Sequence, residues 1–274
     1  LIATLVPPAA PVARSEQAQL QEIGAYLARL EQADIFSGVV VIARDGEPLF
    51  SRAYGHADRE KQIPNTVATP FMLGSVNKLF TGLAIGQLVE QGKLSYEDPL
   101  AKFLADFPDP ESASKIKIKH LLSHTSGLGD YLGTQAYRDA LDRMVAVKAR
   151  FDILPRKPPA FEPGTKWAYS NIGYELLGSV IEIVSGQDYY DYMQKHVFAP
   201  AGMTSTRLDF HYGVIPNRAR GYMLMDERTY NSLPPSAKAI AKPGVIYNAP
   251  LHDTSMKTVD DAIDPPSLQI VPGI

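Results

Sequence analysis

The sequence lacks cysteine, an excess of positive charge and long apolar segments. Without cysteine, disulfides, thiolate metal sites and a cysteine nucleophile are excluded. A formal net charge of −3 provides no basic field to hold nucleic acid or an anionic membrane. Beyond the N-terminus, no stretch approaches the roughly 20 apolar residues of a membrane-spanning helix. With 45% hydrophobic and 21% charged residues, the composition is typical of a globular domain that binds neither nucleic acid nor lipid.

The N-terminus has a composition of its own. Residues 1–14 are apolar and rich in small residues, and the chain does not begin with methionine. This pattern is typical of the end of a secretory signal peptide whose basic leader is absent. The alternative is a disordered apolar segment with no targeting role. We expect a periplasmic or secreted protein.

The order of predicted elements indicates an α+β fold. A Val- and Ile-rich run and a second run, joined by Asp45-Gly46, predict a β-hairpin after a first amphipathic helix. The middle of the chain is helical, and its last part is rich in proline. We predict a signal remnant or disordered segment at 1–14, helix plus hairpin at 15–66, a helical lobe at 67–210 and an irregular tail at 211–274. The predicted helices are 15–33, 75–91, 118–123, 135–150, 171–185 and 189–196, and the predicted strands are 37–43 and 48–55.

Ser75 and Lys78 form the first chemically informative pair. Residues three apart at the start of a helix lie on one face, so the lysine amine can reach the serine hydroxyl. A serine hydroxyl needs an adjacent base to attack a carbonyl, and a buried lysine can act as one. The helix N-terminus also favours a developing oxyanion. Taken alone, the pair is a weak signal and is more typical of a capping serine with a surface lysine.

Tyr169 and Asn171 form the second pair, where a Pro-Gly turn leads into a predicted helix. At such a junction, a phenol can relay protons and an amide can bind a substrate carbonyl. The alternatives are a core tyrosine and an asparagine that caps the helix. Asn171 could fill both roles.

Together these motifs resemble one family: the class C serine β-lactamases, the low-molecular-weight penicillin-binding proteins, and their esterase and D-aminopeptidase relatives. Ser75 and Lys78 match the family's S-x-x-K motif, and Tyr169 and Asn171 match its Y-x-N motif. The resemblance extends over about residues 35–222. Further matching phrases are Phe71-Met72-Leu73-Gly74-Ser75, His120-Leu121-Leu122-Ser123-His124-Thr125-Ser126-Gly127-Leu128 and Val197-Phe198-Ala199-Pro200-Ala201-Gly202-Met203.

The resemblance implies a β-lactamase/transpeptidase-like α+β fold, in which an all-helical lobe is inserted into an antiparallel-sheet lobe. It implies acyl transfer without a cofactor, with Ser75 as nucleophile, Lys78 and Tyr169 as proton-handling residues and Asn171 as a substrate-binding residue. The expected substrates are small esters, amides, peptides or β-lactams, with short-chain esters or amides first, D-amino-acid peptides second and β-lactams third. No G-x-S-x-G motif supports the competing α/β-hydrolase fold.

The family's third motif, Lys-Thr-Gly or His/Trp-x-Gly, has no match. Lys257-Thr258 is followed by Val259 and His252-Asp253 by Thr254, without the required glycine. In the family, the strand that carries this motif supplies an oxyanion-hole N–H, and loss of such a donor costs about 10²–10³ in rate. We therefore expect an incomplete sheet. A fragment, a natural truncation, or strands supplied by a partner or a swapped second copy would each explain it. A catalytically inactive binding protein is the alternative function.

The remaining histidines and aromatic residues predict little by themselves. His120 and His124 are four apart, as metal ligands on a helix can be, but no third ligand is spaced nearby, so a metal site is disfavoured. Trp167 and the Tyr189-Tyr190 pair are interpreted as packing residues.

Overall fold

The computed structural model of the chain describes residues 15–129, 158–207, 215–232, 238, 242–244 and 246–248. These residues form an α+β structure that divides into two compact units. The first unit comprises the described residues up to Phe71 together with Asn217–Arg220, and the second runs from Met72 to Pro216 and onward from Gly221. Among the described residues, no helix combines the length and apolarity needed to cross a membrane.

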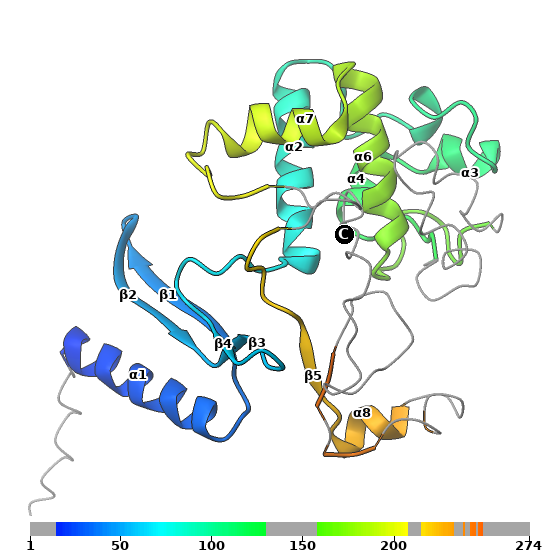
Figure 1. The fold of residues 1–274 in the computed structure, drawn as a ribbon. Helices are drawn as coiled ribbons and strands as arrows, with labels where there is room; N and C mark the ends of the chain where they lie inside the picture. The colour runs from blue at the N-terminus through cyan, green and yellow to red at the C-terminus, as the bar shows by residue number, and fades with distance from the viewer. Residues whose placement is uncertain are drawn as a thin grey trace, which may run out of the picture. The chain divides into compact units, whose positions relative to one another are not determined.

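The first unit opens with a capped helix and the predicted hairpin (Figure 1). Helix α1 (Glu16–Gln32) begins after Ser15, whose Oγ accepts the N–H of Ala18. Strands β1 (Gly38–Arg44) and β2 (Glu47–Tyr54) pair antiparallel. Asp45 and Gly46 between them both have positive φ, the conformation of a tight hairpin turn. The prediction of a helix followed by a hairpin is confirmed.

A close approach between helix and strand holds this part together. Helix α1 packs on β2, and Gly24 is its buried residue. A Cβ at Gly24 would lie 3.3 Å from Cε2 of Phe50, which belongs to the buried face of β2. The missing side chain at position 24 thus sets how closely the helix meets the strand.

A second, smaller ladder follows the hairpin, formed by β3 (His56–Asp58) and β4 (Ile63–Pro64). Arg220 extends this region, because its N–H donates to the carbonyl of Ala57 and its guanidinium lies 3.3 Å from Asp58 and from Glu60. The neighbouring Ala219 N–H donates to the carbonyl of Pro70. A segment about 150 residues downstream thus joins the first unit, which no local sequence pattern predicts.

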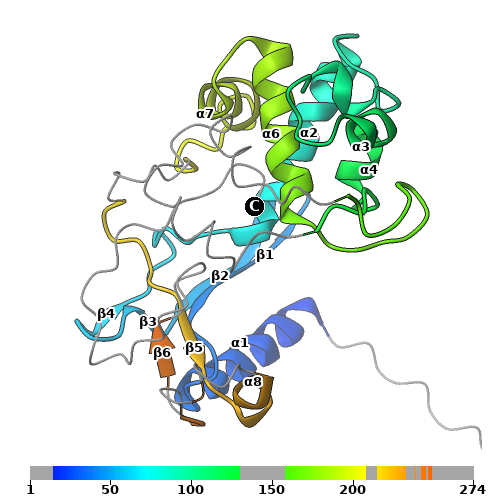
Figure 2. The ribbon, with the colours of Figure 1, turned by 90° about the vertical axis from the view of Figure 1, so that its right-hand side faces the viewer.

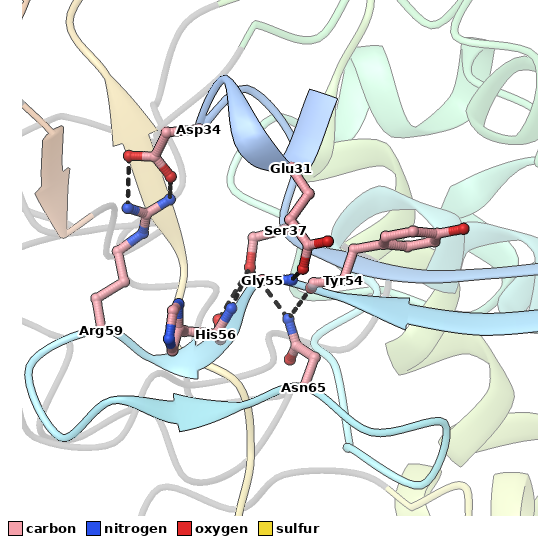
Figure 3. Close-up of polar contacts among 8 residues, drawn as sticks. All are labelled: Glu31, Asp34, Ser37, Tyr54, Gly55, His56, Arg59 and Asn65. Atoms are coloured by element: carbon pink, nitrogen blue, oxygen red, sulfur yellow. Dashed lines mark hydrogen bonds and ion pairs between the residues drawn. The ribbon is translucent and has the colours of Figure 1, made fainter. Parts of the chain in front are cut away.

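Ser37 and Asn65 satisfy the backbone at the junction of β2 and β3 (Figure 3). Ser37 Oγ donates to the carbonyl of His56 and accepts the His56 N–H at 3.0 Å. Asn65 Nδ2 donates to Ser37 Oγ and to the carbonyl of Tyr54, at 3.0 and 2.8 Å. Gly55 between these groups has φ 64°, and a Cβ there would lie 2.6 Å from Ser37 Oγ. Only glycine fits this turn without displacing the serine.

The second unit is mainly helical. Its central helix α6 is buried from Asn171 to Ile181 and packs against α2, α4 and α7. Both ribbon views show α2 and α6 side by side (Figures 1 and 2). The elements are η1 (Gly74–Asn77), α2 (Lys78–Glu90), η2 (Leu100–Lys102), α3 (Pro110–Lys115), α4 (Ile118–Leu122), α6 (Asn171–Ser185), α7 (Tyr189–Met193), the π-helical turn η5 (Gln194–Phe198), β5 (Tyr222–Leu224), α8 (Glu227–Ser232) and β6 (Ile246–Asn248).

One hydrophobic core joins these helices. It includes the fully buried side chains of Ile85, Leu88, Leu121, Leu177 and Tyr189. Helix α6 ends at Gly186, whose φ of 69° is the left-handed conformation expected of a glycine C-cap. The predicted helix at 171–185 and its glycine cap are therefore confirmed.

The C-terminal part contains more order than predicted. Within the range expected to be irregular, β5 pairs antiparallel with β6, and α8 lies between them in the chain. Each of these strands has three residues, too few for a period of two to be visible in the sequence. The helix predicted at 135–150 and the signal remnant predicted at 1–14 lie outside the described residues. The predicted domain boundaries stay predictions.

The Asn65 network yields a stability prediction. We expect Asn65→Ala to lower the free energy of unfolding by about 1–3 kcal/mol, because the buried carbonyl of Tyr54 loses its donor. Denaturant titration followed by circular dichroism measures this. Ser51→Ala, on the exposed face of β2, is the control and should change stability by less than about 0.5 kcal/mol. Equal effects of the two substitutions would contradict the role given to Asn65.

Candidate active site

Ser75 and Lys78 meet through a tight helical turn. Ser75 lies in η1, a 3₁₀ turn, and Lys78 is the first residue of α2. Residues three apart are eclipsed in a 3₁₀ turn, which brings their side chains together more directly than the α-helical start that the sequence predicts. Lys78 Nζ donates to Ser75 Oγ at 3.3 Å. Ser75 is exposed, whereas Lys78 is 7% exposed, so the hydroxyl is open to solvent above a covered amine.

Tyr169 and Asn171 reach the same point from the start of α6. Tyr169 Oη lies 2.6 Å from Ser75 Oγ, and Asn171 Oδ1 accepts a hydrogen bond from Lys78 Nζ at 2.9 Å. The Lys78 amine also lies over the rings of Tyr169 and Tyr174, 4.9 and 5.4 Å from their centroids. The structure thus brings together all four site residues predicted from the sequence.

The cap of α6 differs from the alternative raised by the sequence. Ser170, and not Asn171, is the N-cap, with its Oγ accepting the N–H of Gly173. Asn171 occupies the first turn of the helix, where its side chain is free of the capping role and lies 5% exposed beside Lys78. The cap therefore fixes the helix start, and Asn171 projects from it toward the amine.

Contacts of α2 with α6 and α7 hold the Ser75–Lys78 pair close to the Tyr169–Asn171 pair. Helix α2 packs on α6, and Thr81 Oγ1 lies 2.7 Å from Tyr189 Oη in the buried core. This contact is one helical turn beyond Lys78. Of the aromatic residues interpreted as packing residues, Tyr189 is fully buried and Tyr190 packs at the edge of the core. Trp167 is 67% exposed, so its interpretation as a packing residue is wrong.

The turn at 124–127 supports the loop that carries Tyr169. The carbonyls of His124, Thr125 and Gly127 accept the N–H groups of Ala168, Gly164 and Ala160 respectively. Gly127 has φ 75°, and a Cβ there would lie 2.5 Å from the carbonyl oxygen of Phe161. The backbone of the turn at 124–127 therefore packs closely against the loop backbone. The His-Thr-Ser-Gly sequence, one of the phrases that match the family, is the signal that could have indicated a role for His124.

His120 and His124, considered above as a metal pair, each hold a backbone group instead. Nδ1 of His120 accepts the N–H of Lys117, and Nδ1 of His124 accepts the N–H of Ser170, both at 3.2 Å. Within the described ranges, no three His, Asp or Glu side chains are grouped to hold a metal ion. The near-matches to the third motif, at 252–254 and 257–259, lie outside the described residues.

Both histidines predict a pH dependence of stability. Burial lowers the pKa of His120 from its ordinary value of 6.5, and Lys119 and Lys117 add to this. Burial and then the charge of Lys78 lower the pKa of His124. The unfolded chain thus binds more protons below 6.5, so the free energy of unfolding should fall as the pH drops from 6.5 toward the folded-state pKa values.

Denaturant titrations at several pH values from about 8 to 5 measure this fall in stability. The double variant H120N/H124N removes both groups and should show a flatter profile in this window. If the profiles of wild type and double variant run parallel, the histidines are not the cause.

Comparisons with known proteins agree with this geometry. Residues 18–250 match the family model described as Beta-lactamase. The chain is 33% identical over 229 residues to the putative penicillin-binding protein PbpX of Bacillus subtilis, covering 83% of this chain and 54% of PbpX. It is 35% identical over 178 residues to the teichoic acid D-alanine hydrolase of Staphylococcus aureus, covering 65% and 41% of the two chains. The chain spans about half the length of these curated relatives.

A solved structure supports the same assignment. The penicillin binding protein from Bacillus halodurans matches with a TM-score of 0.64 and 29% identity, over 85% of this chain and 68% of that one. The fold is therefore β-lactamase/transpeptidase-like, as the family resemblance implies. With the family model matching most of its length, the chain belongs to the beta-lactamase family.

Proposed function

We propose that this protein is a serine hydrolase that cleaves small carboxylic esters or amides through an acyl-enzyme on Ser75. One observation carries the proposal. The exposed Ser75 hydroxyl lies 2.6 Å from the Tyr169 phenol oxygen and 3.3 Å from the Lys78 amine. These are the contacts that a serine nucleophile needs in order to lose its proton during attack.

The first half-reaction forms the acyl-enzyme. Ser75 Oγ attacks the substrate carbonyl carbon, and the Tyr169–Lys78 pair takes up the serine proton. The carbonyl oxygen becomes an oxyanion, which the backbone N–H of Ser75 stabilises at the start of the helical segment. The tetrahedral adduct then collapses. The bond to the leaving alcohol or amine breaks, and the leaving group takes a proton from the same pair.

The second half-reaction releases the product. A water molecule attacks the acyl-enzyme carbonyl while the Tyr169–Lys78 pair accepts its proton. Collapse of this adduct breaks the bond to Ser75 Oγ, which is reprotonated. Asn171 holds the Lys78 amine through its Oδ1, and this positions the amine for both steps. Its amide can also bind a polar group of the substrate.

Two considerations place esters first among the substrates. An alkoxide leaving group needs less assistance from a general acid than an amine does. The third family motif, whose strand supplies an oxyanion-hole N–H in the family, has no match in this sequence, which favours the substrate that needs less assistance. The relative from Staphylococcus aureus is named for the hydrolysis of D-alanine from teichoic acid, which supports a D-amino-acyl ester as the first substrate to test. D-peptides and β-lactams follow.

We expect wild-type protein to form a covalent adduct of one reagent per chain with a fluorophosphonate, and Ser75→Ala to form none. Because proton transfer contributes about 10²–10⁴-fold, Lys78→Ala and Tyr169→Phe should slow labelling by at least about 100-fold. Intact-mass spectrometry over time measures the rates, and a D-alanyl ester and a penicillin then serve as substrates.

Matched controls on exposed residues of the same types are Ser123→Ala, Lys119→Ala and Tyr96→Phe. Each should label at the wild-type rate. A folded wild-type protein that forms no adduct would overturn the proposal and favour a binding protein. Lys78→Ala labelling within a few-fold of wild type would remove Lys78 from the mechanism.

A further inference from the structure

His124 holds the backbone on both sides of Tyr169. Its carbonyl accepts the N–H of Ala168 at 2.9 Å, and its ring Nδ1 accepts the N–H of Ser170 at 3.2 Å. The residue itself adopts φ 56°, in the left-handed region that side chains rarely occupy. These two bonds fix the main chain immediately before and after the phenol that contacts Ser75.

The ring of His124 also packs against the ring of Tyr169. The two rings are stacked, with centroids 4.5 Å apart and planes 30° apart. Tyr174 from α6 lies against the same imidazole at 5.2 Å, and its hydroxyl is fixed by a bond to the carbonyl of Leu122. Tyr169 is 42% exposed, so stacking restricts a side chain that solvent would otherwise leave free to rotate.

The hydrogen bond from Ser170 requires a neutral imidazole. A ring nitrogen accepts a bond only when it carries no proton, so the proton of neutral His124 resides on Nε2. Protonation of Nδ1 would direct an N–H at the N–H of Ser170 and break this bond. The new positive charge would also lie near Lys78.

The surroundings favour the neutral ring. Burial, followed by the charge of Lys78 on α2, lowers the pKa of His124, and together they outweigh a smaller opposite effect of the Ser170 backbone. Tyr169 and Tyr174 are the titratable groups in ring contact with it, from the loop and from α6. Among the described residues, Lys78 is the charged side chain that acts on this imidazole. The ring therefore changes charge at a pH below its ordinary pKa of 6.5.

We propose that His124 is a positioning residue whose neutral ring holds Tyr169 against Ser75, and that protonation of this ring releases the phenol and slows acylation. The proposal rests on the proposed function, because it assigns Tyr169 its role through Ser75 chemistry. It adds to that function a switch that keeps the site active at neutral pH and reduces activity in acid.

Trp167 provides a reporter that is independent of activity. It is the only tryptophan in the chain, and its ring lies edge-on to that of His124, with centroids 6.1 Å apart. A protonated imidazole quenches the fluorescence of a neighbouring indole much more than a neutral one does. Tryptophan fluorescence measured against pH therefore reports the charge of His124 directly.

The experiment follows three signals of the wild-type chain between about pH 8 and pH 5, where it stays folded by circular dichroism. These are Trp167 fluorescence, the rate of Ser75 labelling by a fluorophosphonate, and the nuclear magnetic resonance signal of ring-labelled Tyr169, assigned with Tyr169→Phe. We expect all three to change with one midpoint below 6.5, and the labelling rate to fall by about 10- to 100-fold.

His124→Asn removes the ring but keeps an amide oxygen for the Ser170 N–H and tolerates the left-handed backbone. It should abolish the fluorescence transition, lower the labelling rate at pH 8 by about 10- to 100-fold and remove the inflection of its pH profile. His120→Asn is the matched control. It removes a histidine that also accepts a backbone N–H, whereas the histidine ring stacked on Tyr169 is that of His124, and it should keep all three transitions.

Two results would overturn the proposal. One is a Tyr169 signal that stays constant while Trp167 fluorescence reports protonation of His124. The other is His124→Asn labelling at the wild-type rate with an unchanged pH profile. A wild-type protein that shows no Ser75 labelling would instead refute the proposed function. In that case the resonance of Tyr169 still decides whether His124 positions the phenol.

Discussion

The buried amine of Lys78 is the group on which the arrangement of the site depends. A buried polar group needs hydrogen-bond partners, because an unsatisfied one carries a large desolvation cost. Lys78 finds them in Asn171 Oδ1 and Ser75 Oγ, and it lies over two tyrosine rings. Because Lys78 begins α2 and Asn171 begins α6, their bond joins the starts of the two helices that form the centre of the second unit. The contacts that surround the buried Lys78 amine therefore include all three other proposed site residues.

One side of the site is buried and the other is exposed to solvent. Lys78 and Asn171 are 7% and 5% exposed, whereas Tyr169 is 42% exposed and Ser75 is open. The covered side is set by the core beneath α6, where packing fixes side-chain positions tightly. The open side is held by a loop and therefore needs local support, which the turn at 124–127 provides through three backbone bonds. Rigidity on one side and access on the other are what a nucleophilic site requires.

Each unit contains a turn that only glycine allows. In the first unit, Gly55 lets Ser37 approach the backbone between β2 and β3, and in the second, Gly127 lets Phe161 approach the turn at 124–127. In both places a side chain or carbonyl occupies the space of the missing Cβ. Polar backbone groups that would otherwise be unpaired are thereby bonded, at Tyr54 and His56 in one unit and at Ala160 in the other.

Local pattern in the sequence predicted the longest helices and strands and, together with the family resemblance, all four proposed site residues. Helix α1, the hairpin and α6 with its Gly186 cap follow from periodicity and turn chemistry, which act over a few residues. The Ser75–Lys78 and Tyr169–Asn171 pairs follow from spacing within one turn, and their joint membership of one site from family resemblance. The 3₁₀ form of η1, the Ser170 cap and the exposure of Trp167 were decided by packing, which spacing does not encode.

Contacts between distant segments were settled only by the tertiary structure. Arg220 contacts Asp58 across more than 150 residues of sequence, and His124 stacks on Tyr169 from another loop. No local periodicity in the sequence predicts either contact. Short strands such as β5 and β6 also cannot be predicted from the alternation of apolar and polar residues, since three residues cannot show one. The sequence by itself, through the types and spacings of its motif residues and their family resemblance, determined which residues are proposed to carry the chemistry. Their distances, exposures and supporting neighbours depend on how segments far apart in the chain pack, and that was decided by the fold.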